Sequence, residues 1–206
     1  MQQSEIHPFT PYIPEGARIL MLGTFPPKQE RWSIPFYYPN WINDMWRIMG
    51  LIFYGDKEHF CDTPNRTFRL DDIKEFLDTR CIALHDTAAE VCRLKDNASD
   101  KWLEIRRPID LQAFLDKMPG LHAVVTTGEK AASVVASLTA TPLPAVGTSE
   151  ECVVAGRHFR HYRMPSTSRA YPMNIAKKAE FYARMFEECG YIINAAAMSA
   201  ATSNTK

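Results

Sequence analysis

The chain has 206 residues, of which 46% are hydrophobic and 23% charged, a composition typical of a folded protein rather than a disordered one. Lysine plus arginine equals aspartate plus glutamate, at 24 each, so the net charge does not by itself indicate a nucleic-acid partner. No apolar run approaches the roughly 20 residues that cross a bilayer, so we expect no membrane partner.

The N-terminal residues and the cysteines bear on the cellular compartment. Residues 1–16 lack a basic segment followed by an apolar one, so we expect no signal peptide and a cytoplasmic location. The five cysteines are odd in number and scattered, and no Cys-x-x-Cys pair occurs. This spacing supports neither a zinc nor an iron–sulfur site, and we expect reduced, mostly buried thiols.

Four short apolar runs predict strands, at residues 18–23, 81–85, 122–127 and 158–164. The first three lack strict alternation, which favours strands covered on both faces of a parallel sheet. Helical spacing and helix-start residues predict helices at residues 40–51, 70–77, 108–118, 129–138 and 172–189, with Pro108 and Pro172 in first turns.

Strands that alternate with helices indicate an α/β fold, and we expect a three-layer α/β/α sandwich. One domain is expected over residues 1–193, followed by a fraying tail of small and polar residues over 194–206. In such folds ligands bind beyond the carboxyl ends of the strands. This rule selects four loops, at residues 23–27, 85–87, 127–130 and 164–168.

The first and last of these loops have suggestive residue types. Residues 23–27, Gly-Thr-Phe-Pro-Pro, form a sharp and stiff turn whose backbone N–H groups can stabilise a developing negative charge. An ordinary turn explains the same residues. Residues 164–168, Met-Pro-Ser-Thr-Ser, offer hydroxyl and N–H donors suited to phosphate oxygens. Arg169 or Tyr171 beyond them is a candidate to fill the space of a flipped nucleotide.

Residues 32–46 are rich in aromatic side chains, whose faces stack on extruded bases. Helical spacing favours a core position for Trp41 and Trp46, whereas Tyr37 and Tyr38, beside prolines, are expected to line a pocket. Asn43 is expected one turn into a helix, where asparagine has no propensity advantage. Its amide is a candidate for orienting a water or a base edge, and a plain surface position is the alternative.

Two further features have more than one explanation. Asp86, at the end of the second strand, either caps a following helix or accepts an N–H from a base edge. Residues 157–184 contain seven Lys or Arg against one acid, Glu180. This basic stretch suits either a phosphate backbone or a solvated protein face.

Taken in chain order, these segments resemble the uracil-DNA glycosylase superfamily, and most closely its hypoxanthine-type branch. Residues 23–27 resemble the first motif, and Tyr-Tyr-Pro-Asn-Trp-Ile-Asn-Asp-Met-Trp at 37–46 resembles that branch's Tyr-Tyr…Asn-x-x-Trp segment. Residues 164–168 resemble the second motif, and residues 82–93 the second-strand region. The similarity spans about residues 17–190.

The resemblance implies a central four-stranded parallel sheet and a monofunctional repair enzyme without a cofactor. Such an enzyme hydrolyses the bond between the sugar and a flipped deaminated base, uracil or hypoxanthine, in DNA; we expect a monomer. By position, Asn43 matches the catalytic asparagine and Tyr38 the stacking aromatic, while Thr24 and Asp86 are expected to bind the base. The loop that grips the DNA backbone corresponds to Pro165, Ser166, Thr167, Ser168 and Arg169.

The sequence departs from the better-known branches at two positions. Phe25 replaces the Asp or Asn that handles the attacking water, and Met164 replaces the His that stabilises the departing base. Asn43 cannot titrate and can only position water. Catalysis would then depend on base flipping and on backbone N–H groups at Phe25.

These departures motivate an alternative function, a nucleic-acid-binding protein of the same fold without catalytic activity. A small-molecule hydrolase of the α/β type is disfavoured because no Gly-x-Ser-x-Gly occurs. A phosphate-loop NTPase is disfavoured because the Gly-x-x-x-x-Gly-Lys-Ser/Thr run is missing.

Overall fold

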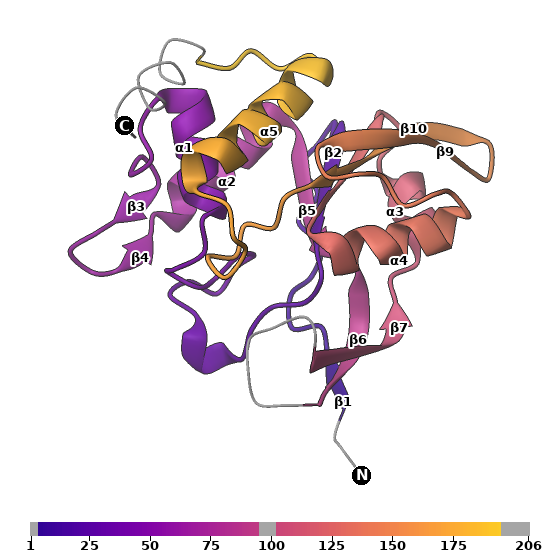
Figure 1. Cartoon of the computed structure of the whole chain (residues 1–206), viewed down its shortest axis with the longest axis horizontal. Helices are drawn as coiled ribbons and strands as arrows, with labels where there is room; N and C mark the ends of the chain where they lie inside the picture. The colour runs from indigo at the N-terminus through magenta and orange to yellow at the C-terminus, as the bar shows by residue number, and fades with distance from the viewer. Residues whose placement is uncertain (1–3, 95–101, 195–206) are drawn as a thin grey trace.

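A computed structural model describes residues 4–94 and 102–194 (Figure 1). Its central sheet has the strand order β5-β2-β8-β10-β9. The strands are β2 (Ile19–Gly23), β5 (Ile82–Asp86), β8 (Ala123–Thr127), β9 (Thr148–Val154) and β10 (Arg157–Met164). β2, β5, β8 and β10 run parallel, as predicted, and β9 pairs antiparallel with β10 at the edge. The prediction of a four-stranded sheet therefore missed a fifth strand, β9.

β9 escaped prediction because it lacks an apolar run. Among its residues only Cys152 is buried, and two glutamates face outward or lie half-exposed. A turn at Ala155 and Gly156, both in the left-handed region at φ 46° and 78°, joins it to β10. Turns of this kind match the twist of paired strands and fix their register. Pairing with a neighbour, rather than composition, makes this segment a strand.

Within the described residues, five α-helices cover the two faces of the sheet (Figure 1). α1 (Met45–Tyr54), α2 (Leu70–Arg80) and α5 (Ile175–Glu188) pack on one face, and α3 (Leu111–Lys117) and α4 (Glu129–Thr139) pack on the other. Alternate side chains of β2 divide between the two cores, Ile19 and Met21 in the first and Leu20 and Leu22 in the second. The three-layer α/β/α arrangement follows from this double coverage.

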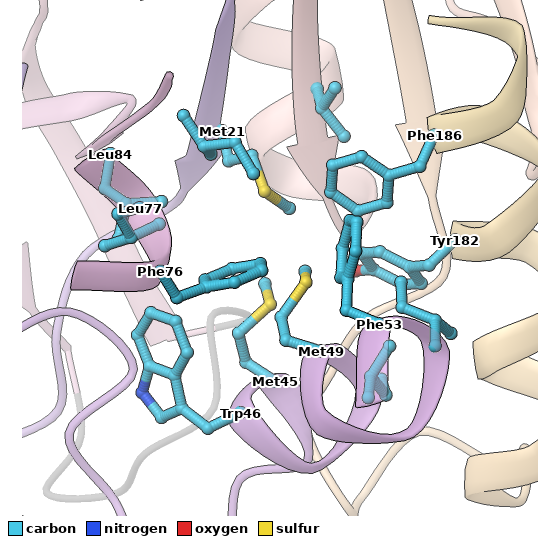
Figure 2. Close-up of a cluster of buried hydrophobic side chains, with 14 of the residues drawn as sticks. Met21, Met45, Trp46, Met49, Phe53, Phe76, Leu77, Leu84, Tyr182 and Phe186 are labelled. Atoms are coloured by element: carbon cyan, nitrogen blue, oxygen red, sulfur yellow. The ribbon is translucent and has the colours of Figure 1, made fainter. Parts of the chain in front are cut away.

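The core beneath α1, α2 and α5 is rich in aromatic and methionine side chains. Figure 2 shows Met45 and Phe53 of α1 and Phe76 of α2 below Met21 of β2, with Phe186 of α5 at the side of the same cluster. Each fully buried side chain of this size contributes roughly 1.5–3 kcal/mol relative to exposure. The core anchors the segment that precedes α1.

A second, three-stranded sheet consists of β1 (Ser4–Ile6), β6 (Ala88–Arg93) and β7 (Leu103–Pro108), all antiparallel. β6 follows β5 after one residue, Thr87, whose N–H donates to the Gly23 carbonyl at 2.9 Å. The capping alternative for Asp86 is therefore wrong, because a strand and not a helix follows it. A short 3-10 helix (Gln29–Arg31) and a hairpin of β3 (Cys61–Asp62) and β4 (Thr67–Phe68) complete the described elements.

Three helix starts differ from the prediction. α3 begins at Leu111 because the Asp110 carboxylate accepts the Ala113 N–H at 3.0 Å. α5 begins at Ile175 because the Asn174 side chain accepts the Lys177 N–H at 2.8 Å. Both capping residues have an extended backbone, so the helix does not continue toward the N-terminus beyond them. Pro108 thus belongs to β7 and Pro172 to a loop. The third case, α1, is described with the site.

All five cysteines are free thiols, and all but the half-buried Cys81 are buried. Burial raises the pKa of the Cys61 and Cys189 thiols to about 11, so both remain protonated and unreactive near neutral pH. Within residues 4–94 and 102–194, no helix has the length and apolar character to span a bilayer. Of the predicted tail, only Asn194 is described, and its N–H donates to the Ile52 carbonyl.

We predict that acid destabilises the fold through His161 of β10. This ring is fully buried against the Thr126 hydroxyl, at 3.0 Å, and burial lowers its pKa to about 4. Between pH 6.5 and 4 the unfolded chain binds a proton that the folded chain does not, so stability is lost as pH falls through that window. Urea unfolding at pH 7 and 4.5 should show a loss of about 2–3 kcal/mol from this group.

The variant His161→Gln should lose less stability over the same pH range. Part of the dependence remains, because burial also lowers the pKa of His85 to about 4. An equal pH slope in wild type and variant would contradict the assignment.

Candidate functional site

A pocket of about 700 Å³ opens at the carboxyl ends of the parallel strands. Residues 23–27, 38–40, 42–43 and 166–172 form most of its wall, together with Asp86 and Thr127. The volume falls within the usual range for small-ligand sites, and the position is the one that the strand-end rule indicates.

Nine of the ten predicted site residues line this pocket, although they come from distant parts of the chain. They are Thr24, Phe25, Tyr38, Asn43, Asp86, Ser166, Thr167, Ser168 and Arg169. Pro165 does not line it. This proline is buried behind the loop, where its carbonyl accepts the Tyr182 hydroxyl at 2.9 Å.

Gly23 and Asp86 form the floor of the pocket. The parallel register of β2 and β5 places them side by side. A Cβ atom added to Gly23 would lie 2.3 Å from the Asp86 Oδ1 and 3.7 Å from a ring carbon of Tyr38. Glycine is required here for close approach. Backbone bonds from Thr87 and Ala88 to the carbonyls of Gly23 and Thr24, at 2.9 and 3.1 Å, fix this contact.

His7 pairs with Asp86 and was not predicted. Its Nε2 lies 2.9 Å from the Asp86 Oδ2, and both side chains are buried, at 5% and 9% exposure. β1 pairs with β6, and the His7 N–H donates to the Ala89 carbonyl, which places the imidazole beside the floor. The two residues are 79 positions apart, and a lone histidine just after a short N-terminal strand gives no periodic signal.

The side chains of the two adjacent tyrosines take different directions. Tyr38 has a left-handed backbone, at φ 49°, which is uncommon for an aromatic residue. Its ring lines the pocket, and its hydroxyl lies 3.1 Å from that of Thr127. Strained backbone of this kind is enriched at functional sites.

Tyr37, by contrast, is buried in the core, so its expected place in the pocket is wrong. Its hydroxyl donates to the Thr10 carbonyl at 2.9 Å and lies 2.8 Å from the His85 Nδ1. Because the single hydroxyl proton goes to Thr10, His85 must donate from Nδ1. Burial, with a smaller effect from His7, lowers the pKa of His85 to about 4, so this ring is neutral near pH 7.

Asn43 precedes α1 instead of lying within it. Its N–H donates to the Asn40 carbonyl at 2.8 Å, and its Oδ1 accepts the Met45 N–H at 2.9 Å. The Asp44 N–H is also engaged outside the helix, by the Thr167 carbonyl at 2.9 Å. These bonds start the helix at Met45. The Asn43 Nδ2 has no hydrogen bond to any residue that the structure describes, which leaves two N–H donors for the pocket.

A buried arginine supports the turn that carries Asn43. Arg47 is 5% exposed and donates to the carbonyls of Trp41 and Asn43, at 2.7 and 3.2 Å. Its guanidinium lies 4.1 Å from the centre of the Trp41 ring, a cation–π contact. Trp41 is only half-buried, while Trp46 is fully in the core and donates its indole N–H to the Tyr37 carbonyl at 3.2 Å. The predicted core position thus holds fully for Trp46.

A buried ion pair joins this turn to the loop at residues 164–168. Lys178 has no exposed surface, and its Nζ donates to the Asp44 Oδ2 at 2.9 Å and to the Ser168 carbonyl at 2.8 Å. Arg169 pairs with the other carboxylate oxygen of Asp44 at 3.2 Å. The two walls of the pocket are therefore held together through one carboxylate and one ammonium group.

The basic stretch at 157–184 does not form an unpaired cationic face. Arg160, Arg163 and Lys177 pair with acidic side chains at 2.9, 3.1 and 2.6 Å. Lys178 is buried, and among the members of this stretch that lie in the described residues, Arg169 lines the pocket. The interpretation as a solvated protein face fits most of this stretch better.

The side chains of Phe25 and Met164 pack against other apolar groups. The Phe25 ring packs in a small cluster with Ala88, Val91 and Leu103. Its N–H makes no hydrogen bond with any described residue, so it remains available at the pocket wall. Met164 is 1% exposed and belongs to the core. Neither side chain can replace the titratable group of the better-known branches.

A scan against protein-family models finds no match to this chain, and a search of the curated proteins finds none either. The solved structures do contain similar folds. One is the solution NMR structure of a protein from Methanosarcina acetivorans that is provisionally named a uracil DNA glycosylase. The match covers 88% of this chain and 98% of that chain, with a TM-score of 0.58 and 18% sequence identity. The two proteins share a fold.

We predict that Gly23→Ala destabilises the protein by about 1–3 kcal/mol through overpacking against Asp86. Urea denaturation measures this loss. Gly120→Ala is the matched control, because its added Cβ would meet its nearest atom at an ordinary 3.7 Å. In Gly23→Ala/Asp86→Ala the two losses should be less than additive, since the clashing oxygen is gone. Full additivity would contradict the close contact.

Removal of the buried ammonium should be more costly. Lys178→Met leaves the Asp44 carboxylate buried with only Arg169 as a charged partner, and the free energy of unfolding should fall by about 3–5 kcal/mol. Asp44→Asn in that background should restore part of the loss. The control is Lys177→Met, since Lys177 is exposed and its pair with Glu180 is worth at most about 1 kcal/mol. Equal losses at 177 and 178 would disprove the role of the buried pair.

Proposed function

We propose that the protein is a DNA glycosylase that hydrolyses the N-glycosidic bond of a flipped deaminated base, uracil or hypoxanthine. The observation that carries the proposal is the convergence of Tyr38, Asn43, Asp86 and the Phe25 N–H on one pocket at the carboxyl end of the sheet. The shared fold with a protein provisionally named a uracil DNA glycosylase supports the same class of enzyme.

The floor and one wall of the pocket suit an extruded base. Its ring stacks on Tyr38, a contact worth about 1–3 kcal/mol per base. The Asp86 Oδ1, which accepts no hydrogen bond from any described residue, accepts the N–H at the edge of the base. Burial, and then the Asp86 carboxylate, raise the pKa of the Tyr38 hydroxyl above its usual range, so this side chain stays neutral beside the base.

Asn43 and the Phe25 N–H act on the bond that breaks. Asn43 holds the attacking water through its free N–H donors and the second lone pair of its Oδ1. The water oxygen bonds to the anomeric carbon as the base departs with the bonding electrons, and the base takes up the released proton. The Phe25 N–H donates to the oxygen on which negative charge develops. Without a titrating base, this arrangement favours good leaving groups.

The loop at residues 164–168 and its extension suit the phosphates beside the flipped nucleotide. Ser168 is exposed, and the Ser166 hydroxyl accepts its N–H at 3.2 Å, which makes a compact turn with hydroxyl and N–H donors at its surface. Asp44 holds the Nε of Arg169, so the terminal N–H groups of this half-exposed guanidinium remain for a phosphate. The Tyr171 side chain is not held in this way and is better suited to fill the space that the flipped nucleotide leaves in the DNA helix.

The alternative is a DNA-binding protein of this fold that lacks catalysis. It is favoured by the apolar side chains of Phe25 and Met164, because neither position contributes a titratable group to the pocket. Both functions need the same surface, so an activity assay must separate them.

We predict cleavage of at least one oligonucleotide bearing uracil, hypoxanthine or xanthine, paired or single-stranded, detected by alkaline scission of the abasic site. Asn43→Ala should lower kcat by at least about tenfold. Because this variant also loses the cap on Met45, worth about 1 kcal/mol, its unfolding must be measured alongside. Asn43→Asp keeps that cap but lacks the N–H donors. The control is Asn65→Ala, on the β3–β4 turn.

Three results would change the assignment. No cleavage of any substrate, together with salt-sensitive DNA binding, favours the binding protein. Full activity in Asn43→Ala removes Asn43 from the mechanism and leaves the enzyme class intact. A loss in Asn65→Ala equal to that in Asn43→Ala would show that the assay reports folding.

A further inference from the structure

The two oxygens of the Asp86 carboxylate have different surroundings. Oδ2 is bound to the His7 Nε2 at 2.9 Å, on the side away from the pocket, since His7 is not among the lining residues. Oδ1 lies over Gly23 and has no hydrogen-bond partner among the residues that the structure describes. One oxygen is thus held from behind, and the other is presented to a ligand in a fixed direction.

The His7 ring is itself fixed, and its contacts determine which nitrogen faces Asp86 with a proton. The Phe9 N–H points at the His7 Nδ1, 3.2 Å away, while the Phe9 carbonyl lies 2.9 Å from the same atom. In the neutral ring Nδ1 accepts from Phe9, so Nε2 carries the hydrogen. In the protonated ring Nδ1 donates to the Phe9 carbonyl, and Nε2 again carries hydrogen. Asp86 receives a donor in both states.

The segment at residues 7–12 is held firmly enough for this task. The Tyr12 N–H donates to the Leu84 carbonyl at 3.1 Å, and the Leu84 N–H returns a bond at 2.9 Å. The Phe25 ring packs edge-on against the His7 ring, with centres 5.3 Å apart. His7 is therefore a rigid part of the floor although it comes from the N-terminal end of the chain.

Other groups near Asp86 do not provide a charge. Burial, and then the Asp86 carboxylate, raise the pKa of Tyr37 and Tyr38 above the usual range, so both hydroxyls stay protonated. The pKa of His85 is lowered to about 4, chiefly by burial, so its ring is neutral. Arg93, whose guanidinium lies over the Phe25 ring, is paired with Glu5 at 2.8 Å. The direct charge-assisted donor to Asp86 among the described residues is His7.

We propose that His7 is a positioning residue that determines specificity, because its Nε2–H holds the Asp86 Oδ2 and so aims Oδ1, as an acceptor, at the ligand. The pocket would then select bases that present a ring N–H, as uracil, hypoxanthine and xanthine do. Cytosine and adenine present a ring lone pair at the same place, which would face a buried carboxylate without a proton between them. This inference rests on the proposed function, since it assumes a base in this pocket.

The contact between the Asp86 Oδ1 and the base distinguishes bases by whether the ring nitrogen carries a proton, and not by their size. Thymine and guanine also carry a ring N–H, so their exclusion must depend on other walls of the pocket. Without the His7 donor the two oxygens of Asp86 are no longer held in one orientation, so the acceptor that meets the ring N–H of the base is no longer fixed. Loss of His7 should therefore weaken the preference for deaminated bases more than it weakens binding to DNA.

The test measures Kd for oligonucleotides bearing 2′-fluoroarabino analogues of uridine and cytidine, which bind without being cleaved. In wild type we expect preference for the uracil analogue. His7→Leu should reduce the uracil-to-cytosine ratio at least tenfold, and His7→Gln, which retains an N–H donor, should preserve most of it. His158→Leu, on the exposed face of β10, is the matched control and should leave the ratio unchanged.

A double-mutant cycle excludes a merely structural effect of His7. Asp86→Ala removes both oxygens, so it should abolish discrimination, and His7→Leu should then add nothing. Because both analogues are measured on the same protein, a partly unfolded variant does not alter the ratio. An unchanged ratio in His7→Leu overturns the inference and leaves the glycosylase proposal standing. If the wild type prefers the uracil analogue but cleaves no natural substrate, the role of His7 stands and the proposed catalysis does not.

Discussion

The ion pair between Asp44 and Lys178 is the interaction on which the pocket depends. The two residues lie 134 positions apart, yet their side chains meet at 2.9 Å with almost no exposure to water. A single buried charge costs several kcal/mol, so each group requires the other. Lys178 also binds the Ser168 carbonyl, and the Asp44 N–H binds that of Thr167. The pair therefore sets the distance between two walls that the backbone does not connect locally.

The floor depends on a different constraint, the parallel register of β2 and β5. That register brings Gly23 against Asp86, where no side chain other than hydrogen fits. Walls and floor together form a site whose groups are held before a ligand arrives, which is how binding energy is directed to catalysis. Most of the groups in contact with the pocket interior are neutral or act through backbone N–H. The proposed chemistry accordingly relies on orientation and electrostatics more than on acid–base transfer.

Much of the fold was predictable because buried parallel strands have a distinct composition. The runs before Gly23, Asp86 and Thr127 are apolar on both faces, and β10 also follows its prediction closely. Helix starts were less predictable, since the caps Asp110 and Asn174 compete with prolines that also suit a first turn. β9 was missed because an edge strand with exposed glutamates owes its structure to hairpin pairing.

The sequence by itself determined four strands and the loops at their carboxyl ends, because period and loop chemistry are local properties. The resemblance to a known superfamily then selected the site residues, nine of which meet in one pocket. Only the tertiary structure decided that Tyr38 lines the pocket while Tyr37 lies in the core. The tertiary structure also brought His7 to Asp86, and it buried Lys178, which belongs to a mostly basic stretch of the sequence. These outcomes depend on which distant backbone passes nearby and supplies a hydrogen-bond partner, and burial of a polar group is favourable only where such a partner exists.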